Sequence, residues 1–289
     1  MTNDITVLNS HYGIPGRLIF KEGDGGLVFA EVTNEFSIGR IYLQGGHVTH
    51  FQPKDQEPVL WVSAWFADHP NDGDKPAHGF VRTSLWEVLG SGETDDHETF
   101  ILLGLSDNEN TLATWPHSFS LELNVLFGTC LSVSLLISNN GDRPFSFTGA
   151  LHSYFNVGDS RRIQILGLEG KDYLDKVDGF SRKKQEGPVV MEEETDRVYL
   201  DTSGECVIED PIMDRAVRIN KKGSNTTVVW NPGAEKSGTM NNMGKNAYRN
   251  MVCVETANAA NDTIALAPGE TLCVKAYAYL FILQQLFFY

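Results

Sequence analysis

Two segments far apart in the chain each place a proton-transferring side chain among residues typical of β-strands. His152 lies in the segment 149–159, where small, apolar and aromatic residues alternate ahead of a Gly-Asp turn. Glu255 lies in the segment 251–258, which has the same strand character. A strand holds a side chain rigidly at a sheet surface, where an imidazole can give or take a proton near neutral pH. Together the segments predict one acid–base pair on two strands.

Other segments combine polar side chains with turns or strand ends. His78 and Arg82 lie four positions apart in a turn containing Pro and Gly, and Asp196 stands at the head of a predicted strand. Trp230 and Asn231 end another strand. Aromatic rings can pack on the C–H faces of a sugar while amides and carboxylates bind its hydroxyls, a mixture typical of ligand pockets. Taken singly, each side chain is more often structural than functional, and Asp196 beside Arg197 can form a weak local ion pair.

The sequence lacks the common motifs of metal and cofactor sites. No group of His, Cys or Asp residues has the spacing of metal ligands. There is also no P-loop, no dinucleotide-binding fingerprint and no Gly-x-Ser-x-Gly segment. The sequence therefore predicts neither a metal nor a cofactor.

Composition restricts the class of partner. The 289 residues include 38 acidic and 23 basic side chains, a formal net charge of -15. This charge repels nucleic acid and anionic lipid, so the expected partner is a small molecule, with no nucleic acid and no membrane. The N-terminus shows no secretory signal, which predicts a cytoplasmic protein with reduced cysteines. The final apolar run, Ala276–Leu283, is too short for a membrane span and predicts a buried last strand or an apolar tail.

Alternation of apolar and polar residues with a period of two dominates the chain, while helical periodicity is weak. Strands are predicted in the ranges 20–34, 35–51, 99–105, 119–127, 131–138, 163–168, 205–208, 216–220, 226–230, 251–256 and 270–278. The charged ranges 183–186 and 191–195 predict an exposed loop. Short strands with turns roughly ten residues apart predict an all-β fold, a large antiparallel β-sandwich, in a single domain over residues 1–289.

Seven segments, in this order, resemble the aldose 1-epimerase superfamily and within it the glucose-6-phosphate 1-epimerase branch. They are Pro58–Ser63, Pro76–Arg82, Trp115–Phe119, Ala150–Phe155, Thr195–Tyr199, Val229–Pro232 and Val252–Glu255. The resemblance runs from about Leu18 to Val274. It implies a β-sandwich of the galactose-mutarotase type that binds a sugar on one sheet.

The resemblance also implies an activity and a set of roles. The activity is interconversion of the α and β anomers of hexose 6-phosphates by acid–base ring opening, without a cofactor and in a monomer. Glu255 is implied as the general base and His152 as the general acid. His78 is implied to hold or polarise the ring oxygen, Asp196 to bind sugar hydroxyls, and Arg82 to contact the phosphate or a nearby hydroxyl.

The sequence departs from this branch in three places. The arginine-containing segment that normally precedes the His-Gly-Phe turn is missing after Ser63, the acidic residues after the Trp-Asn-Pro segment are replaced around Asn241–Lys245, and the tail from Phe281 is unlike the family. The departures leave two alternatives open, a non-catalytic carbohydrate-binding sandwich or catalytically impaired enzyme, and a mutarotase of unphosphorylated aldoses. A retaining glycosidase fits less well because it pairs two carboxylates.

Overall fold

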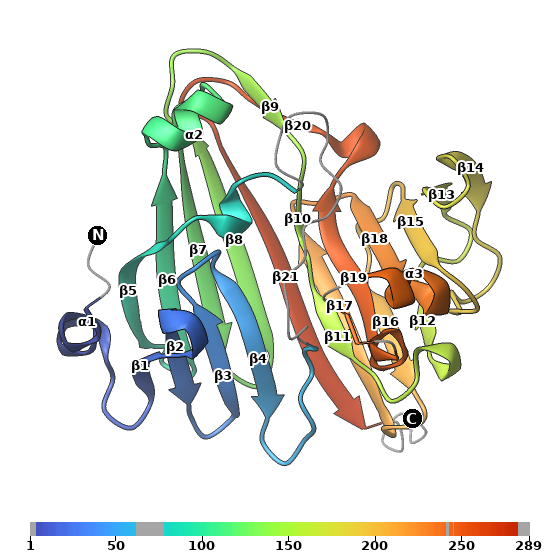
Figure 1. The fold of residues 1–289 in the computed structure, drawn as a ribbon, viewed down its shortest axis with the longest axis horizontal. Helices are drawn as coiled ribbons and strands as arrows, with labels where there is room; N and C mark the ends of the chain where they lie inside the picture. The colour runs from blue at the N-terminus through green and yellow to red at the C-terminus, as the bar shows by residue number, and fades with distance from the viewer. Residues whose placement is uncertain (1–3, 62–77, 241–242, 245, 283–289) are drawn as a thin grey trace. The chain divides into compact units, whose positions relative to one another are not determined.

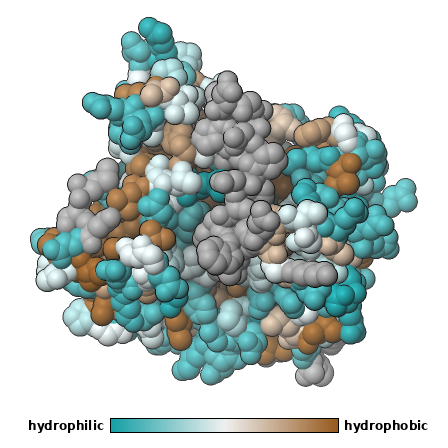
Figure 2. All heavy atoms as spheres, viewed as in Figure 1, coloured by the Kyte–Doolittle hydropathy of each residue, from teal (hydrophilic) through white to brown (hydrophobic). Residues whose placement is uncertain are grey.

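The structure is a computed structural model that describes residues 4–61, 78–240, 243–244 and 246–282 (Figure 1). Within these residues, strands dominate and pair with antiparallel neighbours. The predicted all-β, antiparallel fold class is confirmed. Hydrophilic residues cover much of the face shown in Figure 2. No helix in the described part of the chain is long and apolar enough to cross a membrane.

The contacts divide the chain into two compact units. Unit 1 comprises residues 1–58, 68–146 and 265–273, and unit 2 comprises residues 59–67, 147–264 and 274–289. Among the described residues, the division falls between Pro58 and Val59 and within three strands, β9 (Phe145–Phe147), β20 (Ile264–Leu266) and β21 (Thr271–Ile282). The expectation of a single domain stays a prediction.

Unit 1 carries two runs of strands that pair in chain order. The first is β1 (Leu18–Glu22), β2 (Val28–Thr33), β3 (Ser37–Tyr42) and β4 (His47–Pro53). The second is β5 (Glu87–Glu93), β6 (Thr99–Ser106), β7 (Phe119–Phe127) and β8 (Leu131–Asn139). In β7 the five apolar residues at odd positions, Phe119 to Phe127, are all buried, so the alternation in the sequence is the alternation between core and outer face.

Unit 1 also contains four short helical segments among its described residues. They are α1 (Ile5–Tyr12), η1 (Asp24–Gly26), η2 (Val81–Thr83) and α2 (Glu109–Thr114). Both α-helices begin at a side-chain cap, because Asp4 accepts from the backbone of Thr6 and Val7, and Asn108 accepts from that of Asn110 and Thr111.

Unit 2 contains the sheet that carries the predicted acid–base pair. Both β10 (Gly149–Leu151) and β11 (Tyr154–Asn156) pair with β19 (Met251–Asn258). The sheet continues through β18 (Thr226–Asn231), β15 (Thr195–Tyr199), β13 (Asp172–Asp175) and β14 (Ser181–Lys184), whose order can be followed in Figure 1. All eight residues of β19 are buried, and these include the polar residues Glu255, Thr256 and Asn258.

The remaining strands of unit 2 pair in the order β12 (Gln164–Leu166), β16 (Cys206–Asp210), β17 (Arg215–Lys222) and β21 (Thr271–Ile282). Its helical segments are η3 (Ser160–Arg162), α3 (Gly233–Thr239), η4 (Ala247–Asn250) and η5 (Ala260–Asp262). The apolar run near the C-terminus forms strand through Ile282, as predicted, but this part of the strand is mostly half-buried and Phe281 is exposed.

The structure corrects two details of the sequence analysis. The ranges 20–34 and 35–51 each hold a pair of strands, β1–β2 and β3–β4. The charged ranges 183–186 and 191–195 are not simply an exposed loop. Lys183 and Lys184 belong to β14, Gln185 is buried and accepts from the Tyr199 hydroxyl at 2.7 Å, and Met191 is buried. Charged residues can alternate with buried ones on an edge strand, and composition alone does not separate that pattern from a loop.

Three features of the sequence fall wholly or partly on residues 62–77, 241–242, 245 and 283–289. They are the missing arginine segment after Ser63, the replaced acidic residues around Asn241–Lys245, and the end of the C-terminal tail. These features lie outside the described residues.

Asn231 ties the end of β18 to the segments that follow it. Its buried side chain donates to the carbonyls of Tyr248 and Met251, both at 2.8 Å, and accepts from the Gly233 N–H at 2.9 Å. Asn231→Ala leaves these groups without their partner, and we expect a loss of about 3 kcal/mol in the free energy of unfolding. Chemical denaturation measures the loss. Asn110→Ala, on the exposed side of α2, is the control and should change stability by less than about 0.5 kcal/mol; equal losses in the two variants would contradict the assignment.

Candidate active site

The register of one strand pair places His152 directly opposite Glu255. Leu151 pairs with Thr256 in β10–β19, and Tyr154 pairs with Cys253 in β11–β19. Two residues, 152 and 153, separate these pairs on one side, and two residues, 254 and 255, separate them on β19. His152 therefore falls opposite Glu255. Residues directly opposite on antiparallel strands extend to the same face of the sheet.

The two side chains are in contact. His152 Nε2 lies 3.2 Å from Glu255 Oε1. The glutamate side chain is 6% exposed and the histidine side chain 27% exposed, so the carboxyl is buried behind an imidazole that reaches solvent. The imidazole also stacks on Tyr154, with ring centroids 4.7 Å apart and planes 10° from parallel. The stacking fixes the orientation of the ring relative to the carboxyl.

The surroundings of Glu255 favour its protonated form. Burial, followed by the charge of Asp196, raises the pKa of the Glu255 carboxyl to about 8, against a lesser opposing effect of Lys176. Asp196 Oδ2 forms an ion pair with Lys176 Nζ at 3.0 Å. A carboxyl with a pKa near neutral pH can accept and return a proton under ordinary conditions.

A row of side chains crosses the same face of the sheet beside this pair. The register pairs Asp196 with Trp230, Trp230 with Cys253, and Cys253 with Tyr154. Glu255 is two residues along β19 from Cys253 and so extends to the same face. The row continues through Trp61. Its backbone N–H donates to the Tyr154 carbonyl at 2.9 Å, and its ring stacks on the Tyr154 ring with the ring centroids 5.8 Å apart. The face thus combines aromatic rings with one acid–base pair and one further carboxylate.

Three of the five predicted site residues lie in this one sheet, namely His152, Glu255 and Asp196. The other two belong to unit 1. His78 is exposed and has a positive φ of 57°. Arg82 lies in η2, where its carbonyl accepts from His47 Nε2 at 2.9 Å. The roles assigned to all five residues stay predictions.

Lys176 was not found by sequence reasoning. It follows β13 directly. Its backbone N–H donates to the Asp196 carbonyl at 2.9 Å, so the pairing of this segment with β15 continues one residue beyond β13. In the sequence it is one of several lysines in a polar stretch. Only the pairing of β13 with β15 distinguishes it from the others.

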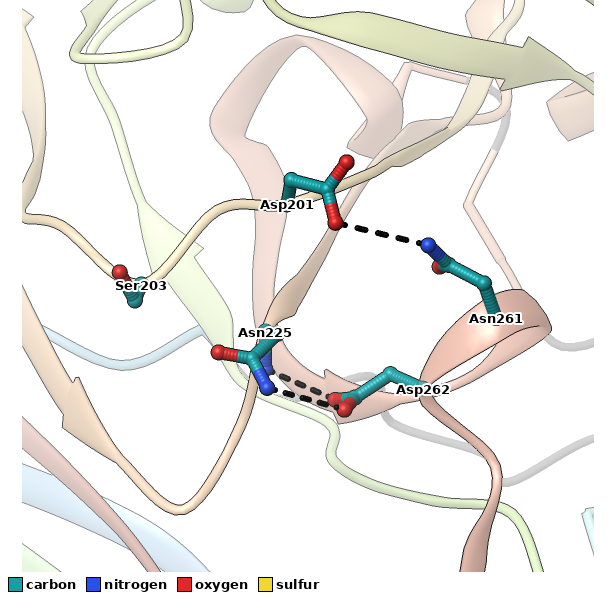
Figure 3. Close-up of a pocket in the computed structure, with 5 residues that line it drawn as sticks. All are labelled: Asp201, Ser203, Asn225, Asn261 and Asp262. Carbon is teal, nitrogen blue, oxygen red and sulfur yellow. Dashed lines mark hydrogen bonds between the residues drawn. The ribbon is translucent and has the colours of Figure 1, made fainter.

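Unit 2 also holds an acidic pocket that contains none of the predicted site residues. It is lined by Asp201, Ser203, Asn225, Asn261 and Asp262 (Figure 3). Its side chains hydrogen-bond to one another, Asn261 to Asp201 at 3.5 Å and Asn225 to Asp262 at 3.1 Å. Because the pocket contains neither member of the acid–base pair, it is not the candidate site.

The fold and the site define a class of protein. It is an all-β protein in which a buried carboxyl contacts a partly exposed imidazole on one face of a sheet. The profile of the family described as aldose 1-epimerase matches residues 65–275. The chain belongs to the aldose 1-epimerase family.

Individual relatives agree with this assignment. The chain is 33% identical over 255 residues to a Cenchrus ciliaris protein named "Putative glucose-6-phosphate 1-epimerase", covering 80% of this chain and 77% of the relative. An Escherichia coli K12 protein of the same name is 33% identical over 238 residues, covering 75% and 79%. The solved structure of a "putative mutarotase" from Salmonella typhimurium superposes with a TM-score of 0.84 at 28% identity, covering 93% of this chain and 95% of that one. The predicted mutarotase type of β-sandwich is confirmed.

Proposed function

We propose that the protein interconverts the α and β anomers of hexose 6-phosphates such as glucose 6-phosphate, with Glu255 as general base and His152 as general acid. The observation that carries the proposal is the 3.2 Å contact between His152 Nε2 and Glu255 Oε1. Family membership and the names of the relatives support the reaction and the substrate class.

The reaction needs two proton transfers at neighbouring atoms. The Glu255 carboxylate takes the proton of the C1 hydroxyl while the His152 imidazolium gives a proton to the ring oxygen, and the C1–O5 bond breaks to give the open-chain aldehyde. Rotation about the C1–C2 bond presents the other face of the carbonyl, and the reverse transfers close the ring. Both oxygens are bonded to C1, so an acid and a base that touch each other can reach both. The protons balance without a cofactor.

The neighbouring side chains fit supporting roles. Asp196 can accept hydrogen bonds from sugar hydroxyls, and the rings of Trp61 and Tyr154 can cover an apolar face of the sugar. Lys176 holds Asp196 and offsets its charge near Glu255. We assign to His78 a contact with the ring oxygen and to Arg82 a contact with the phosphate or a nearby hydroxyl. With a net charge of -15, a doubly charged phosphate requires a local cation.

Anomer relaxation tests the proposal directly. Pure α-glucose 6-phosphate is dissolved with and without the full chain, and the approach to equilibrium is followed by NMR or polarimetry. Acceleration above the spontaneous rate is expected. Acceleration with free glucose or galactose but not with the phosphate ester would refute the substrate and retain the mechanism. Calorimetric binding of the sugar phosphate without acceleration would refute catalysis and identify a carbohydrate-binding protein.

Replacing Lys176 should move the pH profile. Removal of its positive charge in Lys176→Met raises the pKa of Glu255 further, so the rising limb of kcat/KM, which follows loss of the Glu255 proton, moves to higher pH. The loss of the ion pair with Asp196 should also raise KM about fivefold. Lys183→Met is the matched control, because Lys183 pairs with Asp175 and Asp178 at 2.8 Å and not with Asp196. A profile that moves equally in both variants would count against the role of Lys176.

We further propose that the protein acts in the cytoplasm as a monomer and without a nucleic-acid partner. The acidic composition supports the last of these. Sedimentation of the full chain measures its mass in solution and tests whether it is a monomer.

A further inference from the structure

The face that carries the acid–base pair brings together three side chains with the donor atoms of a transition-metal site. Among the described residues, one donor atom each of His152, Cys253 and Glu255 lie within 4.8 Å of one another. The imidazole and the carboxyl are already in contact at 3.2 Å. Cys253 joins them because it is two residues from Glu255 on β19 and so extends to the same face.

We propose that His152, Cys253 and Glu255 bind a thiophilic divalent cation such as Zn²⁺, and that the bound ion switches the acid–base pair off. Imidazole nitrogen, thiolate sulfur and carboxylate oxygen are the three donor types that Zn²⁺ takes in proteins. Three protein ligands leave one position of a tetrahedral ion for water.

The distances are close to those that the ion requires. At its usual bond lengths Zn²⁺ holds a sulfur and a nitrogen ligand roughly 3.5 Å apart, so a pair at the 4.8 Å limit would approach by about 1 Å on binding. His152 can supply that movement, because its side chain is 27% exposed and follows a break between β10 and β11.

The charges also balance. A thiolate and a carboxylate together neutralise the two charges of the ion, which removes most of the cost of burying it. Binding forms Zn–S, Zn–O and Zn–N bonds in place of bonds from the ion to water, and the thiol proton of Cys253 is released to solvent. No oxidant or reductant takes part.

The consequence for activity rests on the proposed function. A carboxylate and an imidazole nitrogen that ligate a metal cannot exchange protons with a sugar, so Zn²⁺ should inhibit anomer interconversion and a chelator should restore it. The spacing in the sequence gave no sign of the site, because its ligands come from segments about 100 residues apart in the chain.

Cobalt substitution tests the site without reference to activity. One equivalent of Co²⁺ added to the reduced full chain should give a thiolate-to-cobalt charge-transfer band and the intense visible bands of tetrahedral Co²⁺, and Zn²⁺ should displace both. Cys253→Ala should abolish the charge-transfer band and weaken binding by at least about 100-fold, more than the loss of an outer hydrogen-bond partner of a ligand. Cys206→Ala, which removes another buried free thiol, is the matched control and should keep the band.

Two further measurements complete the test. Glu255→Gln removes a second ligand without creating a cavity and should weaken Co²⁺ binding. In Cys253→Ala, activity relative to that variant's own metal-free rate should no longer respond to Zn²⁺. Absence of the band at one equivalent, its loss in Cys206→Ala instead, or undiminished Zn²⁺ inhibition of Cys253→Ala would overturn the site. A cobalt band in a protein with no isomerase activity would refute the proposed function and leave the metal site standing.

Discussion

Glu255→Gln should lower kcat for anomer interconversion of glucose 6-phosphate by about 10³-fold, close to the spontaneous rate. The glutamine side chain keeps the size of glutamate and can still contact His152, but it cannot accept the proton of the C1 hydroxyl. Because the proton moves only in the transition state, KM should change little. Polarimetry of the two proteins in metal-free buffer measures the ratio. Glu209→Gln, on β16 away from the His152 contact, is the control and should keep the full rate. If the rate of Glu255→Gln is within tenfold of the rate of the unmodified protein, Glu255 is not the general base.

The same substitution should stabilise the fold at alkaline pH. The folded pKa of Glu255 is about 8, against 4.5 for an ordinary glutamate. Between these values the unfolded chain has lost the proton while the folded protein keeps it, so the stability of the folded protein falls as pH rises through this window. Each unit of pKa difference corresponds to about 1.4 kcal/mol, so the total is on the order of a few kcal/mol.

Thermal or chemical denaturation at two pH values checks this expectation. At about pH 9 the Glu255→Gln variant should be more stable than the unmodified protein, and at about pH 4 the two should be similar. Greater stability together with lost activity would identify a buried charge kept for catalysis. A variant that is less stable at both pH values would show that Glu255 serves the packing of β19 instead.

His152→Ala should lower kcat by about 10²- to 10³-fold, again with little change in KM. The variant loses the donor that protonates the ring oxygen, and the charge that develops there stays uncompensated. It also leaves a ring-sized space over Tyr154, where the histidine stacks at 4.7 Å. Added imidazole should occupy this space and recover part of the rate, with the recovery rising as more imidazolium is present.

Rescue separates an acid from a structural side chain. A residue needed only for folding would not be replaced by a small molecule in solution. His11→Ala, on the exposed helix α1, is the control and should neither lose activity nor respond to imidazole. If His152→Ala keeps the full rate, the proposed acid is wrong. If it loses the rate and imidazole restores none of it, His152 acts by holding Glu255 and does not donate the proton.

Several parts of this protein could be predicted from local sequence. The strands β7 and β8 were predicted to within one residue, since alternation with a period of two is imposed by the side-chain directions of a strand. The short helices α2 and α3 were not predicted, because six or seven residues are too few to show helical periodicity against polar surroundings. The seven ordered segments predicted the aldose 1-epimerase family, to which the chain belongs.

The sequence by itself determined the residue types available for chemistry, the strand character of the segments that carry them and the family. Only the tertiary structure decided which of them meet. The pairing of β10 and β11 with β19 puts His152 opposite Glu255, and the pairing of β13 with β15 brings Lys176 to Asp196. The tertiary structure also brings the Cys253 sulfur close to the side chains of His152 and Glu255. The physical reason is that strand register, and the burial that raises the pKa of Glu255, arise from contacts between distant segments, which no local pattern encodes.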